Sequence, residues 1–297
     1  LGEGTQLTVT GGTTYTWNIG GSNPISVSPT TYTTYTVTVT NANSCSTVTT
    51  VTVTVNNAPT ASITIAETSG TANDGTLCVG SALSITATGG ASYQWTVPGG
   101  GTNNSNPLST AAATTANGGN YTVVVTDANG CTASTTTLIT VNNNPAPSIS
   151  ITENSGTANN NAICLGAAAT ITASGGGTYQ WTLPNASTPT TNPLNIIAAT
   201  ATDNGVYTVT VTNNGCTNTA TVNLTVHTVP SPSISGTSTV CNGQSTALTA
   251  NGGTTYAWST GGANPITVSP TANTTYTVTV TDSNSCTAST TTLVTVN

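Results

Sequence analysis

Residues 85–95 read ITATGGASYQW, and the same pattern recurs three more times along the chain. Each copy has an alternating apolar and polar run, a Gly-Gly pair and then Tyr-x-Trp, and the other copies cover residues 7–17, 171–181 and 248–258. The four tryptophans of these copies are the only tryptophans of the chain. Self-similarity at this scale is typical of repeat architectures. The sequence therefore predicts four tandem repeats.

A second shared stretch follows each Tyr-x-Trp. It begins with Tyr-Thr-Val and ends at a cysteine, as in YTVTVTNANSC at residues 35–45 and YTVTVTDSNSC at residues 276–286. A further alternating run closes each repeat, and a stretch with proline follows the first three. The first repeat lacks an N-terminal strand and a first cysteine, and the second and third carry an extra hairpin segment. We place the repeats at residues 1–56, 57–142, 143–227 and 228–297.

The apolar period within each repeat is two. Val37 and Val39 alternate with threonines, which is the pattern of a half-buried β-strand. Val and Thr are both β-branched and suit a pleated sheet. Short strands separated by Gly, Asn and Pro turns, with a Trp on one central strand, predict an all-β, two-sheet antiparallel sandwich. We expect each core to contain the repeated aromatic residues Trp17, Trp95, Trp181, Trp258, Tyr35, Tyr121, Tyr207 and Tyr276.

Composition excludes several classes of function. The chain has 297 residues, of which seven are acidic and none is Lys or Arg, so its formal net charge is −7. Lysine Schiff-base chemistry, phosphate clamping and electrostatic nucleic-acid binding all need the missing cations. Trypsin-like proteases also have no cleavage site in this threonine-rich chain. No run of about 18 apolar residues is present, so we expect no membrane insertion in this segment.

The sequence gives little support for a catalytic or metal site. The only histidine, His227, stands at the end of the third repeat, where the second has Asn142, and we interpret it as a linker residue. We therefore predict no enzymatic activity and no cofactor. Glu67 and Asp74 in the second repeat and Glu153 in the third lie in the extra hairpin segment. A calcium site with added carbonyl ligands is the alternative there, although Ca²⁺ prefers about six to eight oxygen ligands.

The residues also resemble a known family. Each of the second and third repeats has Tyr-x-Trp on one strand and then a segment that leads into a second strand, from Asn117 to Tyr121 and from Asp203 to Tyr207. This arrangement resembles the immunoglobulin-like fold with its tyrosine corner. More narrowly, the Gly-Gly, Asn-Pro and YTVTVT patterns are similar to tandem Ig-like and PKD-like repeats of large secreted surface proteins of Bacteroidetes. The resemblance implies four tandem immunoglobulin-like antiparallel β-sandwich domains, arranged like beads on a string, in an extracellular, cell-surface setting.

The cysteines divide into one pair per repeat, apart from the first repeat. We expect one disulfide at one pole of each of the last three sandwiches, and oxidised cysteines imply export. Aligning Leu7 with Leu248 puts the partner of Cys45 immediately before Leu1, and a free thiol at Cys45 is the alternative. The expected pairs are Cys78 with Cys131, Cys164 with Cys216, and Cys241 with Cys286.

The function that we predict is structural and non-enzymatic. The chain would be a segment of an extracellular repetitive adhesin or filament, acting as a disulfide-stapled, protease-resistant stalk or fibre. Its expected partners are cell-surface or matrix components, glycans, or further copies in a fibre, with no nucleic acid. One alternative is a carbohydrate-binding accessory module of a secreted hydrolase, with an exposed aromatic such as Tyr32. Another is a polymerising fibre subunit that accepts a donated strand.

Overall fold

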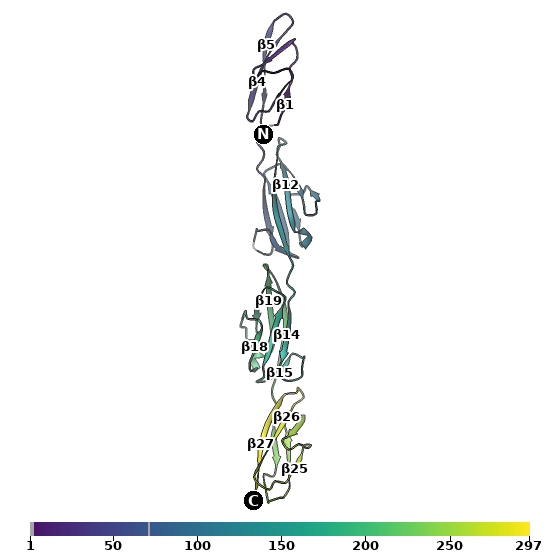
Figure 1. The fold of residues 1–297 in the computed structure, drawn as a ribbon, viewed down its shortest axis with the longest axis vertical. Helices are drawn as coiled ribbons and strands as arrows, with labels where there is room; N and C mark the ends of the chain where they lie inside the picture. Colours follow the sequence, from purple (N-terminus) through teal and green to yellow (C-terminus); the bar gives the residue numbers. More distant parts are fainter. Residues whose placement is uncertain (1–2, 71) are drawn as a thin grey trace. The chain divides into compact units, whose positions relative to one another are not determined.

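The computed structural model describes residues 3–70 and 72–297 (Figure 1). The chain divides into two compact units, residues 1–143 and 144–297, and each unit contains two β-sandwiches. Each sandwich has its own cluster of buried apolar residues, drawn from one sequence repeat. The prediction of an all-β chain of tandem immunoglobulin-like sandwiches is confirmed. The exact repeat boundaries stay predictions.

The third repeat illustrates the fold. Its pairings are antiparallel except for one parallel pair, between β15 and β20. One sheet contains β14 (Ser148–Glu153), β16 (Ala169–Ser174) and β18 (Leu194–Ile196). The other contains β15 (Ala162–Cys164), β20 (Cys216–His227), β19 (Gly205–Asn213) and β17 (Thr178–Thr182), in that order.

The second and fourth repeats follow the same plan. In the second, the sheets contain β11 (Leu108–Thr110), β8 (Leu83–Thr88) and β6 (Ser62–Glu67), and then β10 (Thr102–Asn103), β9 (Ser92–Thr96), β12 (Gly119–Thr126), β13 (Thr132–Asn142) and β7 (Thr76–Cys78). In the fourth, they contain β21 (Ser233–Gly236), β23 (Thr246–Asn251) and β25 (Ile266–Val268), and then β22 (Thr239–Val240), β27 (Thr287–Val296), β26 (Thr274–Thr281) and β24 (Thr255–Trp258).

The first repeat is smaller. It contains β1 (Thr5–Leu7) paired with β3 (Ile25–Val27), and a sheet of β2 (Thr14–Trp17), β4 (Thr33–Thr40) and β5 (Ser46–Val53). Within residues 3–56 no strand corresponds to β14 or β15 of the third repeat. Its buried cluster has six residues, against eleven in the third repeat, so this sandwich is the least covered of the four.

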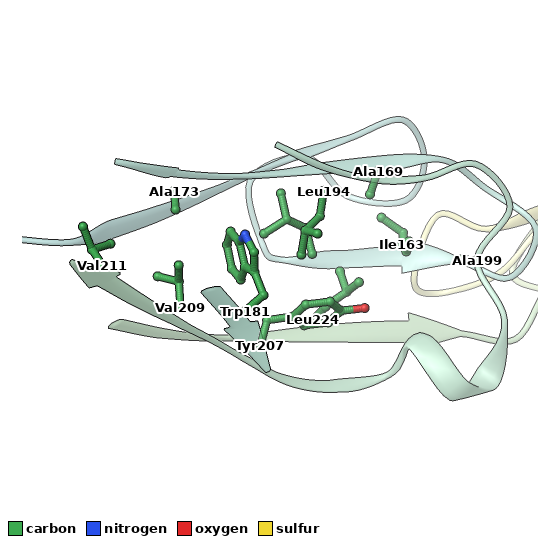
Figure 2. Packing of buried hydrophobic residues seen from close by; sticks show 11 residues of the cluster. Ile163, Ala169, Ala173, Trp181, Leu194, Ala199, Tyr207, Val209, Val211 and Leu224 are labelled. Atoms are coloured by element: carbon green, nitrogen blue, oxygen red, sulfur yellow. The ribbon is translucent and has the colours of Figure 1, made fainter. Parts of the chain in front are cut away.

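Each core is built around the repeated tryptophan. Trp181 is fully buried, and Figure 2 shows its indole between Ala173 and Leu194 on one side and Val209 and Leu224 on the other. The other three tryptophans are at most 5% exposed. Val on alternate positions of β19 faces this core, while the intervening threonines are partly exposed. The period of two in the sequence thus becomes the two faces of a sheet.

The repeated Asn-Pro dipeptide has a structural role that its sequence does not reveal. The side-chain amide of Asn106 donates to the carbonyl of Ala87 at 2.8 Å and accepts from its N–H at 2.8 Å. An asparagine before proline makes the same double contact in the other repeats, in the pairs Asn23–Val9, Asn192–Ala173 and Asn264–Ala250. The asparagine side chain thus bonds to both backbone polar groups of one residue, as a neighbouring strand would do.

The Gly-Gly pair is a turn between two strands. Gly89 has a positive φ of 105°, which favours glycine. A Cβ on Gly90 would meet the side chain of Val125 and the carbonyl of Thr126 on the adjacent strand. The first glycine is therefore needed for its backbone angle and the second for close approach.

Replacing Asn106 tests the side-chain pairing. Asn106→Ala leaves both backbone polar groups of buried Ala87 without their partner, and we expect a loss of about 1–3 kcal/mol in the free energy of unfolding. Chemical denaturation followed by tryptophan fluorescence measures it. Asn104→Ala, in the same loop at an exposed position, is the matched control. Equal stability of the two variants would contradict this role.

Candidate functional site

The two cysteines of a repeat lie at opposite ends of its sandwich. In the fourth repeat, Thr239 and Val240 of β22 pair in parallel with Thr295 and Val296, the last residues of β27. Cys241 follows β22 and so lies at the end where the chain leaves the repeat. Cys286 precedes the first residue of β27, which is 10 residues long. At about 3.3 Å per residue, roughly 30 Å separates the two cysteines.

The third repeat has the same arrangement. Cys164 is the last residue of β15 and pairs with His227, the last residue of β20. Cys216 is the first residue of β20, so a strand of 12 residues lies between the two ends. A disulfide needs Cα atoms within about 7 Å of each other. A bond between two cysteines of one repeat is therefore out of reach.

The disulfide instead joins two repeats. Cys164 of the third repeat is bonded to Cys286 of the fourth, with a Cα–Cα distance of 5.6 Å and a sequence separation of 122 residues. The predicted pairs Cys164–Cys216 and Cys241–Cys286 are therefore wrong. The predicted pair Cys78–Cys131 is also wrong, because Cys131 is a free thiol. The error lies in placing both cysteines of a repeat at one pole.

The remaining cysteines fall into two groups. Cys45, Cys131 and Cys241 are free thiols, of which Cys45 and Cys241 are exposed and Cys131 is half-buried. Cys78 and Cys216 are not free. The predicted partner of Cys45 lies before Leu1, outside the described residues.

A tight turn presents the cysteine that precedes the last strand of the first, second and fourth repeats. In the fourth repeat, Oδ1 of Asp282 accepts the N–H groups of Asn284 and Cys286, both at 2.9 Å. Ser285 completes the turn with a φ of +64°. The first repeat makes the same turn with Asn41, so the side-chain oxygen suffices and the charge is not required.

The extra hairpin segment of the third repeat surrounds the disulfide. Ser155 Oγ accepts the N–H of Cys164 at 3.0 Å, and Thr157 Oγ1 lies 3.3 Å from Ser285 Oγ of the fourth repeat. Cys164 is 5% exposed and Cys286 is fully buried. A polar contact between the two repeats thus lies beside the buried bond.

Carboxylates of the extra segments hold backbone amides. Glu67 Oε1 accepts the N–H groups of Asp74 at 2.9 Å and Gly75 at 3.2 Å. Glu153 does the same in the third repeat, for Asn159 and Ala162. Within residues 3–70 and 72–297, no group of three or more His, Cys, Asp or Glu side chains is placed to hold a metal ion. The calcium alternative stays untested.

A groove opens onto the core of the first repeat. It has a volume of about 410 Å³ and is lined by Leu7, Val9, Trp17, Val37 and Val51, among others. In the third repeat, Ile151 and Ile149 of β14 pair with the residues that correspond to Leu7 and Val9, and they pack on the core. The groove therefore lies where the other repeats have their first strand.

Two tyrosines each donate a hydrogen bond to the backbone carbonyl four residues earlier, which is the contact of a tyrosine corner. Tyr207 OH donates to the carbonyl of Asp203 and Tyr121 OH to that of Asn117, both at 3.0 Å. Each carbonyl belongs to the last residue of a single-turn 3₁₀ helix, η2 (Ala201–Asp203) or η1 (Thr115–Asn117). Burial raises the pKa of Tyr207 to about 12, helped by the nearby carboxylate of Asp203. Burial also raises the pKa of Tyr121, while its hydrogen bond to Asn117 lowers it.

Comparison with known proteins gives likenesses only among solved structures. No protein-family model and no curated protein matches the chain. The N-terminal eight Ig domains of Down Syndrome Cell Adhesion Molecule match all of this chain over 43% of theirs, at 14% identity and a TM-score of 0.47. A three-domain Ig fragment of titin matches 82% of this chain over its full length, at 14% identity and a TM-score of 0.40. Sidekick-1 immunoglobulin domains 1–5 match all of this chain over 77% of theirs, at 15% identity and a TM-score of 0.33.

No helix in the part of the chain that the structure describes is long and apolar enough to cross a membrane.

Exchanging the corner residues tests the cause of the tyrosine pKa shifts. Asp203→Asn keeps the cap on Thr200, because Asn117 makes the same cap on Thr114, and removes the negative charge beside Tyr207. We expect the pKa of Tyr207 to fall, and the reverse change Asn117→Asp to raise that of Tyr121. Alkaline titration by ultraviolet absorbance measures both, and shifts of the same sign would contradict the electrostatic cause.

The same shift predicts how stability depends on pH. An unfolded tyrosine ionises near pH 10, whereas folded Tyr207 holds its proton to about 12. Its contribution to stability is therefore complete below pH 10 and is lost as the pH rises towards 12. Denaturation midpoints measured across this range should fall less steeply in Asp203→Asn than in the parent chain.

Proposed function

We propose that this chain is a structural, non-enzymatic segment of an extracellular repetitive surface protein, a stalk or fibre in which a disulfide joins neighbouring repeats. The bond between Cys164 and Cys286 carries the proposal. Disulfides of this kind persist in oxidising compartments, which supports an extracellular location. The absence of Lys and Arg removes every trypsin-type cleavage site, which suits a protein exposed to secreted proteases.

The position of the disulfide determines how the chain responds to tension. A force applied at the two ends passes through the bond from Cys164 to Cys286, so the residues between them do not bear it. These residues include most of the third and fourth cores. An intra-repeat bond would protect only one sandwich. The inter-repeat bond limits the extension of two sandwiches and keeps them attached if one unfolds.

Aromatic exposure favours a stalk over a sugar-binding module. All four tryptophans are buried in cores and so cannot stack on a glycan. Tyr32 is 69% exposed but stands alone in the first repeat. Any adhesive contact with glycans or matrix components would therefore use surfaces other than the repeated aromatic residues.

Single-molecule stretching of the chain between its ends tests the proposal. We expect the fully unfolded, reduced chain to be longer than the oxidised one by at least roughly 400 Å, since the 122-residue separation is released at about 3.3–3.6 Å per residue. Under oxidising conditions Cys286→Ser should lengthen the final extension. Cys241→Ser, which removes a free thiol, is the matched control and should leave it unchanged. Equal extension with and without reductant would overturn the mechanical role.

The groove of the first repeat favours a second candidate function, the acceptance of a donated strand. In strand complementation, an extended segment adds to an open sheet edge and fills its side-chain pockets. A strand with the sequence of β6, SITIAE, carries isoleucines at the spacing that fills the equivalent place in the second repeat.

A synthetic peptide of residues 60–67 tests this candidate. We expect it to bind the chain and raise the unfolding temperature of the first repeat, as followed by calorimetry. A control peptide in which both isoleucines are asparagine should have no effect. Binding of both peptides, or of neither, would contradict strand acceptance and would leave the disulfide-based role intact.

A further inference from the structure

The exposed thiol of Cys241 occupies the same structural position as the bonded Cys164. Both follow a short strand that pairs in parallel with the end of the last strand of the repeat. The carbonyl of Cys241 accepts the N–H of Gln244 at 2.9 Å, and that of Cys164 accepts the N–H of Ala167 at 3.0 Å. Cys241 is therefore held, like Cys164, at the end where the chain leaves its repeat.

The exposed thiol of Cys45 occupies the same position as the bonded Cys286. Asn41 Oδ1 accepts the N–H of Cys45 at 3.0 Å, as Asp282 Oδ1 accepts that of Cys286 at 2.9 Å. The φ angles of the preceding serines are +62° at Ser44 and +64° at Ser285. The turn thus has the same geometry around the free thiol of Cys45 as around the bonded sulfur of Cys286.

We propose that Cys241 of one chain forms a disulfide with Cys45 of a second copy, so that copies join head to tail by the same bond that joins the third repeat to the fourth. The third repeat's bond shows that a cysteine at the exit of one repeat reaches the turn at the entry of the next. The proposal needs the oxidising compartment of the proposed function but not its mechanical role.

The third free thiol, Cys131, is not open to the same reaction. It belongs to the same type of turn, but residues of the first repeat lie against it. Its Sγ is 4.0 Å from the carbonyl of Asn56. A cavity of about 770 Å³ beside it is lined by Glu3, Gly4 and Val53 among others. A second copy would have to displace the first repeat to reach Cys131, whereas Cys45 is exposed.

The bond requires an oxidant. The two thiols lose two protons and two electrons when the S–S bond forms, and a small-molecule disulfide such as oxidised glutathione accepts them and becomes two thiols. The reaction proceeds by exchange: one protein thiolate attacks the small disulfide and forms a mixed disulfide, and the second protein thiolate then displaces the small thiol.

The contacts beside the two thiols also predict how strongly the copies associate without the bond. At the bonded junction, Thr157 of the extra hairpin segment contacts Ser285. The fourth repeat has only a short segment between β21 and Cys241, so it has no counterpart of Thr157. Fewer polar contacts are therefore available between two copies than between the third and fourth repeats. We expect association to depend on the covalent bond and to disappear in reductant.

Incubation of the full chain in a glutathione redox buffer tests the proposal. We expect a ladder of multiples of the chain mass on a non-reducing gel, which reductant collapses to the single chain. Neither Cys45→Ser nor Cys241→Ser alone should give a ladder. A mixture of the two should give one product of twice the chain mass, joined through the one remaining pair. Cys131→Ser, the matched control, should still form the ladder.

Mass spectrometry of the linked peptides, cut at acidic residues because trypsin has no site, identifies the bond. A peptide that joins Cys241 to Cys45 is expected. Absence of the mixed product, or linkage that includes Cys131 as often as Cys45, would overturn the proposal. Failure here with the internal Cys164–Cys286 bond still present would leave the proposed stalk function standing, because that bond is measured separately in the stretching experiment.

Discussion

The parallel pairing of a three-residue strand with the end of the last strand is the constraint on which the cysteine chemistry depends. In the third repeat, β15 pairs with the last residues of β20 and fixes Cys164 beside His227. Cys216 is the first residue of the same 12-residue strand, so this pairing holds the two cysteines of the repeat far apart. The register of this one short ladder, against the last three residues of β20, therefore decides which end of the sandwich carries Cys164.

Much of the fold could be predicted from the sequence, because its signals are local and repeated four times. The alternation of Val37 and Val39 with threonine predicts half-buried strands, and the single Trp of each repeat predicts a core anchor. Reliable strand prediction does not extend to the pairing partners of a strand, which depend on contacts between distant residues. Cys164 and Cys216 were assigned to one pole for this reason, since nothing in ENSGTANNNAIC encodes a parallel pairing with residues 225–227.

The Asn-Pro pairs show a second limit of the sequence analysis. Asn106 belongs to the Asn-Pro pair that recurs in every repeat, but its partner is the backbone of Ala87. Because any residue type has these backbone groups, no sequence pattern identifies the partner. The tyrosine corner was easier to predict, because Asp203 and Tyr207 lie on adjoining turns of chain and the contact is local. Interactions that join nearby residues were predicted, and those that join distant backbone segments were not.

The bond between the third and fourth repeats gives this pair of repeats a direction. The cysteine at the exit of the third sandwich, Cys164, meets the cysteine at the entry of the fourth, Cys286. Loss of a single cysteine therefore has an effect outside its own repeat, because it leaves a thiol in a neighbouring repeat whose own sequence is intact. Cys131 of the second repeat is such a free thiol, and Cys45 is the only cysteine in residues 1–56.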